Sequence, residues 1–110
     1  METQYRGVVD RYFEAKNAHN TDKVVECFAD DAVVHDEGKE HRGKAAIRSW
    51  SDSVIARYNL SLKVLDVSEE DAHTMHATAE VSGTFDGSPA TLGYRFRFAS
   101  NGLISSLEAS

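Results

Sequence analysis

The spacing of apolar residues changes once along this chain, and that change restricts the fold more than any other feature. Up to residue 58, most apolar side chains recur three or four positions apart, as on one face of a helix. From residue 60 onward they alternate with polar side chains, as in strands that bury one face. Asp86-Gly87 and Asn101-Gly102 are hairpin signals within this second part. Helices followed by antiparallel strands predict an α+β fold, with the helices on one face of a curved sheet.

The chain divides into eight predicted elements within one domain, 1–110, because 110 residues suffice for a single core. They are a helix over 5–16, a short helix from 21 that ends at Asp30-Asp31, a strand over 32–36, a helix over 44–58, and strands over 60–67, 75–82, 92–98 and 103–109. Thr21 is the expected cap of the short helix. Loops are expected over 38–43 and 68–71, and a change of parity at Leu65 predicts a bulge or a twist.

Composition argues against several classes of protein. The 18 acidic and 12 basic residues give a net charge of -6, which disfavours nucleic acid or an anionic membrane as a partner. No stretch approaches the roughly 18 apolar residues of a membrane span. The single cysteine, Cys27, excludes an internal disulfide, and with no signal peptide at the N-terminus it favours a cytoplasmic location. The five histidines match no metal-ligand spacing, so no metal site is predicted.

A candidate site lies where the apolar stretch 32–34 runs into three titratable residues, His35, Asp36 and Glu37. Successive side chains of a strand point to opposite faces, so an inward Asp36 leaves His35 at the rim or outside. A carboxylate with apolar walls can act as a general base. The alternative is a solvated acid that caps the following loop.

Space for a cavity is suggested by the small residues Ala77 and Ala79 beside the large aromatic residues Tyr94 and Phe96. A closely packed helix would give the same pattern. Tyr12 lies on the apolar face of the first helix, as a core residue or as a donor to a ligand oxygen. That face is made by Tyr5, Val8, Val9, Tyr12, Phe13 and Lys16. The predicted ligand contacts are Phe28, Val34, Trp50, Met75, Val81 and Phe96.

Three stretches, FADDAVV, RGKAAIRSW and YRFRFASNGLISSLEAS, are the most specific parts of a resemblance that covers nearly the whole chain. The sequence resembles the nuclear transport factor 2-like superfamily, and most of all its SnoaL-like and ketosteroid isomerase-like branch. The resemblance implies a cone-shaped curved antiparallel sheet wrapped around three N-terminal helices, a cystatin-like α+β barrel. It also implies a mostly apolar pocket at the mouth and a homodimer that pairs through the outer sheet face.

The isomerases of this branch suggest roles for three residues. There, an aspartate moves a proton beside a carbonyl, while a tyrosine and a neutral aspartic acid hydrogen-bond the enolate oxygen. The resemblance places Asp36 at the base position, Tyr12 at the tyrosine position, and Tyr94 where the late-strand acid would stand. A tyrosine can still donate a hydrogen bond, but the missing acid argues against steroid-type isomerisation.

Two functions remain open, because this superfamily hosts enzymes and binding modules alike. The first is a small-molecule-binding protein, acting as an isomerase, cyclase or dehydratase on an apolar, ring-containing or polyketide-like compound. Asp36 would be its base, with Tyr12 and Tyr94 polarising the oxygen and no cofactor required. The alternative is a non-catalytic binding or dimerisation module whose cavity is filled by its own side chains.

Overall fold

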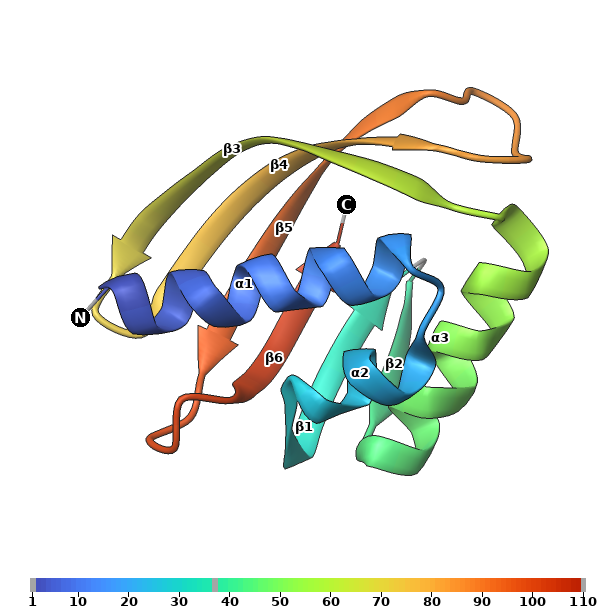
Figure 1. Ribbon diagram of the computed structural model, residues 1–110. Coiled ribbons are helices and arrows are strands. Elements are labelled where there is room, and N and C mark those ends of the chain that lie inside the picture. Colours follow the sequence, from blue (N-terminus) through green and yellow to red (C-terminus); the bar gives the residue numbers. More distant parts are fainter. Residues whose placement is uncertain (1, 37, 110) are drawn as a thin grey trace.

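A curved sheet and three helices make up the computed structural model, which describes residues 2–36 and 38–109 (Figure 1). The helices are α1 (Glu2–Asn17), α2 (Thr21–Glu26) and α3 (Lys44–Tyr58). The strands are β1 (Phe28–Asp36), β2 (Lys39–Arg42), β3 (Ser61–Asp71), β4 (Thr74–Ser82), β5 (Ala90–Phe98) and β6 (Ile104–Ala109). Figure 1 shows α1 lying across one side of the sheet, with the shorter α2 and the α3 helix beside β1 and β2.

The sheet order is β2-β1-β6-β5-β4-β3, so the predicted meander of the last four strands is confirmed. The predicted bulge is also confirmed, because the pairing of β3 with β4 shifts between Val64 and Asp66. One pair differs from the expected antiparallel arrangement. β1 and β6 run parallel, with Val33 opposite Ser106 and Val34 opposite Leu107, so the sheet is mixed.

Three predicted boundaries are wrong, and each error has a local cause. The short helix ends at Glu26, and Asp30-Asp31 lie inside β1, exposed where the β1–β6 register shifts. The predicted loop 38–43 contains the edge strand β2, whose all-polar sequence Lys-Glu-His-Arg carries no apolar alternation. The predicted turn 68–71 continues β3 instead, because this strand is exposed there and needs no buried residue.

The core forms between α1 and the sheet around edge-to-face aromatic contacts. The Tyr12 ring centre lies 5.5 Å from that of Phe96 and 6.0 Å from that of Phe28, and Phe13 lies 5.9 Å from Phe96. These four side chains are at most 3% exposed. Burial of each such side chain contributes roughly 1.5–3 kcal/mol. The predicted apolar face of the first helix is therefore the face that α1 packs on the sheet.

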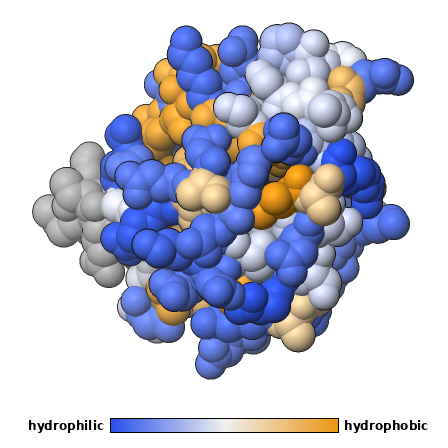
Figure 2. All heavy atoms as spheres, turned by 45° about the vertical axis from the view of Figure 1, so that its right-hand side comes forward, coloured by the Kyte–Doolittle hydropathy of each residue, from blue (hydrophilic) through white to orange (hydrophobic). Residues whose placement is uncertain are grey.

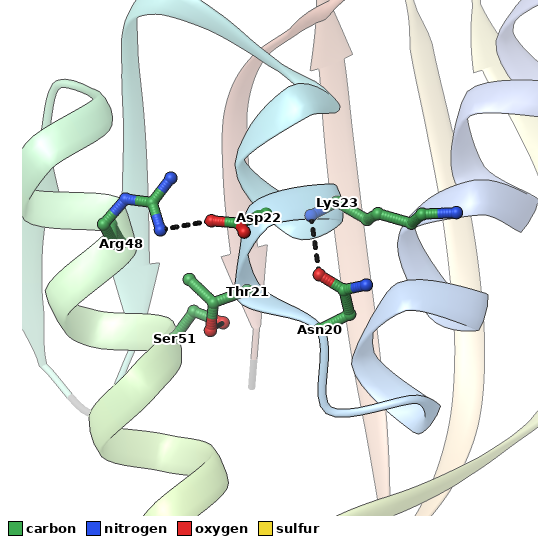
Figure 3. A network of polar contacts seen from close by, with 6 residues as sticks. All are labelled: Asn20, Thr21, Asp22, Lys23, Arg48 and Ser51. Carbon is green, nitrogen blue, oxygen red and sulfur yellow. Dashed lines mark hydrogen bonds and ion pairs between the residues drawn. The ribbon is translucent and has the colours of Figure 1, made fainter.

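Polar contacts hold α2 against α3 and thereby fix the position of α3 (Figure 3). The Asn20 side chain caps α2 by accepting a hydrogen bond from the Lys23 backbone N–H at 3.2 Å, so the expectation of a Thr21 cap is wrong. Thr21 is the first residue of the helix, and its buried hydroxyl lies 3.1 Å from that of Ser51. An exposed ion pair joins Arg48 to Asp22 at 2.6 Å. Ser51 directly follows Trp50, whose side chain lines the candidate site.

The surface is mostly hydrophilic on the face shown in Figure 2, with hydrophobic residues visible in separate groups. None of the helices in residues 2–36 and 38–109 has the length and hydropathy needed to span a membrane.

Candidate functional site

A cavity of about 580 Å³ lies among α1, α3 and the strands β1, β4 and β5. This volume lies within the usual range for small-molecule sites. Its polar groups near the helices are Tyr12, Lys16, Asp36, Trp50 and Tyr94. Its apolar wall includes Val54, Tyr58, Leu60, Val81, Phe85 and Leu92. The cavity is thus mostly apolar, with a few polar groups gathered together.

Asp36 lines this cavity from the end of β1, while the preceding residue, His35, is exposed. From residue 32, the side chains of β1 therefore alternate between the inward and the exposed face as far as its last residue, Asp36. Trp50 Nε1 donates a hydrogen bond to Asp36 Oδ2 at 3.0 Å. This bond fixes the orientation of the carboxylate and leaves its other oxygen for a ligand. Glu37 lies outside the described residues.

Tyr12 and Tyr94 reach the same cavity from α1 and β5, and both are at most 5% exposed. Burial raises the pKa of Tyr12 well above its ordinary value, with smaller contributions from Tyr94 and Asp36. Burial, followed by the Asp36 charge, also raises the pKa of Tyr94. Both phenols therefore stay protonated at neutral pH and can donate hydrogen bonds. Within 2–36 and 38–109, no hydrogen bond joins either hydroxyl to another side chain or to the backbone.

Lys16 is the site residue to which the sequence pattern assigned no role. It follows Tyr12 by one turn of α1 and is 3% exposed, and its Nζ has no hydrogen-bond partner in the part of the chain that the structure describes. The ammonium lies 4.2 Å from the centre of the Trp50 ring, a cation–π distance. Burial lowers the pKa of Lys16 to about 8, although the Asp36 charge opposes this change. The sequence feature that could have identified this residue is a lysine on an otherwise apolar helix face.

Trp50 contacts two charged groups of the cavity, Asp36 and Lys16. The edge of its indole binds Asp36 and its face lies against the Lys16 ammonium. An acid and a base of opposite charge are thereby held in one apolar cavity without bonding to each other. Such an arrangement can take a proton from one part of a ligand and polarise another part.

Two of the six predicted ligand contacts, Trp50 and Val81, lie on the cavity wall. The other four lie in the packed core instead: Phe28, Val34, Met75 and Phe96, each at most 3% exposed. Alternation along a strand identifies the side chains that face inward. It does not show at which residue the packed core ends and the cavity begins. The cavity begins nearer the ends of β4 and β5 that carry Val81 and Leu92.

Several solved structures are similar to this chain over nearly its whole length. The candidate polyketide cyclase SMa1630 from Sinorhizobium meliloti is 38% identical over 94% of each chain, with a TM-score of 0.90. SalBIII, an epoxide hydrolase/cyclase-like enzyme with a role in pyran ring formation in the polyether salinomycin, is 22% identical over 98% of this chain and 90% of its own (TM-score 0.83). RV0760c from Mycobacterium tuberculosis, in complex with estradiol-17beta-hemisuccinate, is 18% identical over 96% of this chain and 92% of its own (TM-score 0.79).

The two more distant structures, SalBIII and RV0760c, show the shared fold alone. Other structural neighbours are described as cystatin-like or nuclear transport factor 2-like, which confirms the predicted α+β cone. A comparison with curated protein sequences gave no match. The family model of the SnoaL-like domain matches residues 9–107, nearly the whole chain. The chain therefore belongs to the SnoaL-like domain family.

Proposed function

We propose that this protein binds a small, mostly apolar, ring-containing molecule in the cavity and moves a proton beside its carbonyl group. The observation that carries the proposal is the meeting of Asp36, Tyr12 and Tyr94 in one apolar cavity. Two structural neighbours support the ligand class, since one acts in pyran ring formation and another was solved with a steroid derivative. A cavity of about 580 Å³ favours this function over a module with a filled interior.

In the proposed reaction, Asp36 accepts a proton from the carbon next to the carbonyl. The electrons of the broken C–H bond form a carbon–carbon double bond, and the oxygen becomes negative. Tyr12 and Tyr94 donate hydrogen bonds to that oxygen, an interaction that is strong where water is excluded. Return of the proton to another carbon gives isomerisation, while attack by the enolate on a second group gives ring closure. No cofactor is needed for these steps.

The test uses decalone, a saturated two-ring ketone, and the single tryptophan of the chain, Trp50, as a fluorescent reporter of binding. We expect decalone to change the Trp50 emission and to exchange its α-protons for deuterium in the presence of the protein. Asp36→Asn keeps an oxygen acceptor for Trp50, so binding should persist while exchange falls by about 100-fold or more. Asp66→Asn, at an exposed site on β3, is the matched control. Unchanged exchange in folded Asp36→Asn would show that another group is the base.

The proposal includes a homodimer that forms through the outer face of the sheet, and a cytoplasmic location. Val64 and Leu65, 38% and 51% exposed at the bulge of β3, support a contact with a second copy. A charge at this position should weaken such a contact. We expect Leu65→Glu to lower the mass measured by sedimentation from that of a dimer to that of a monomer, and an unchanged mass would exclude β3 from the interface.

A further inference from the structure

We propose that Lys16 captures aldehydes and ketones covalently in the cavity, as a protonated Schiff base. The inference rests on the proposed function in one respect, since it requires that carbonyl compounds enter the cavity. It adds a nucleophile to a site otherwise described by a base and two hydrogen-bond donors. The ligand class it assigns is a small apolar compound with an unhindered carbonyl group.

The position of Lys16 in the cavity supports the proposal. Its side chain lines the cavity one turn beyond Tyr12, and it is 3% exposed. Its Nζ has no hydrogen-bond partner within the described ranges 2–36 and 38–109, and it lies 4.2 Å from the centre of the Trp50 ring and 6.0 Å from that of Tyr12. A lysine in a salt bridge is held as an ammonium ion, whereas one held only by a ring face can turn about its flexible stem. Because Lys16 lines the cavity, a carbonyl compound bound there lies within its surroundings.

Burial of Lys16 increases the share of the neutral amine, which is the reactive form, although the Asp36 charge favours the ammonium. The other titratable groups that line the cavity are Tyr12 from α1, Asp36 from β1, Tyr58 from α3, Asp86 from the β4–β5 connection and Tyr94 from β5. Tyr12 and Tyr94 stay neutral, and Trp50 keeps Asp36 from pairing with the amine. With a pKa of about 8 in place of 10.5, Lys16 at about pH 7.5 is neutral roughly 200 times more often than an ordinary lysine.

The reaction is balanced without an oxidant or a reductant. The Nζ lone pair adds to the carbonyl carbon, and one proton passes from the nitrogen to the carbonyl oxygen, which gives a neutral carbinolamine. Loss of that hydroxyl as water, with a second proton, leaves a C=N bond whose nitrogen is positive. This cation occupies the place of the ammonium, so Asp36 and the Trp50 face stabilise it in the same way. The iminium also withdraws electrons from the adjacent C–H bond, which Asp36 can then deprotonate more easily.

The test is reductive trapping of the whole protein with cyclohexanecarbaldehyde and sodium cyanoborohydride at about pH 7.5, followed by peptide mass mapping. We expect Lys16 to be alkylated at least about tenfold faster than the exposed Lys63 of β3, despite its burial. Lys16→Arg keeps the positive charge but cannot form an imine, so the cavity adduct should disappear. Lys63→Met is the matched control and should leave the labelling of Lys16 unchanged. Cyclohexylmethanol, which has the same ring without the carbonyl, should slow the labelling of Lys16 but not that of Lys63.

The outcomes separate this inference from the proposed function. Quenching of Trp50 fluorescence by cyclohexylmethanol, with no adduct at Lys16, would overturn covalent capture and leave the non-covalent site intact. The protein could instead form an adduct at Lys16 while its Trp50 fluorescence does not respond to the alcohol and it exchanges no decalone protons. That result would support covalent capture and would remove support from the proposed Asp36 reaction. Labelling of Lys63 and the other lysines in proportion to their exposure, with Lys16 unmodified, would also overturn the proposal.

Discussion

Replacing Lys16 by methionine should make the protein more stable at neutral pH. Methionine has a similar length and fills the same space, but it carries no charge into a site that is 3% exposed. The ammonium of Lys16 has no hydrogen-bond partner among the residues described, so its removal leaves no polar group unsatisfied. The variant therefore isolates the cost of keeping a charged amine in this cavity.

The magnitude follows from the lowered pKa of Lys16. A change from 10.5 to about 8 corresponds to a destabilisation of about 3 kcal/mol when the amine is charged. Imperfect packing of the methionine offsets up to about 1.5 kcal/mol of this gain. We therefore expect Lys16→Met to raise the free energy of unfolding by about 2–3 kcal/mol at pH 7, or the melting temperature by roughly 10 °C.

The stability gained by Lys16→Met should decrease as the pH rises. The folded state binds the Lys16 proton less tightly than the unfolded state does, so the penalty is complete below about pH 8. It declines as the pH rises and vanishes above 10.5, where both states hold a neutral amine. The stability difference between Lys16→Met and the parent protein should therefore shrink between these pH values.

Urea unfolding of the parent protein and the variant at pH 7, 9 and about 10.5 measures this difference. Titration of tyrosines is common to both proteins and cancels in the comparison. Lys63→Met, at an exposed site, should show no pH-dependent difference. A destabilised Lys16→Met at pH 7, or a gain that stays constant up to pH 10.5, would refute the view that burial of the charge dominates at this residue.

Other substitutions and reagents test the packing around the site. Cys27 is 5% exposed and burial raises its pKa to about 11, so a thiol reagent at pH 8 should react about 100-fold more slowly with the native protein than with the urea-unfolded one. Gly83→Ala should cost about 2 kcal/mol, because its Cβ would collide with the Tyr58 carbonyl oxygen beside the cavity. Gly93→Ala, whose Cβ meets no atom closer than 3.4 Å, should change stability by less than about 1 kcal/mol in the same urea titration. Asn20→Ala should lose about 1 kcal/mol with the cap of α2, and an unaffected unfolding midpoint would contradict the cap.

The elements that bury one face could be predicted from the sequence, and those that bury none could not. The helical face of 5–16 and the alternation over 75–82 and 92–98 reappear as α1, β4 and β5. The edge strand β2 and the second half of β3 contain mostly exposed residues, so their side chains carry no periodic signal. Only the backbone pairing with β1 and β4 shows that they are strands.

Several residues of the candidate site could be predicted from the sequence, but the extent of the cavity could not. Asp36, Tyr12, Tyr94 and Trp50 could be assigned to one inward side, and all four line the cavity. Where the core ends and the cavity begins depends on the curvature of the sheet, which the pattern of one strand does not contain. Lys16 could be placed on the apolar face of the first helix but not in the cavity, because lysine is almost never buried without a partner.

The position of β6 has a consequence for synthesis of the chain. β6 is the parallel neighbour of β1 and also the antiparallel neighbour of β5, and it follows all the other strands in sequence. Until β6 has been synthesised, β1 and β5 therefore lack the strand that lies between them in the complete sheet. Insertion of β6 is the step that joins them, and until then the free edge of each is open to pairing with another nascent chain.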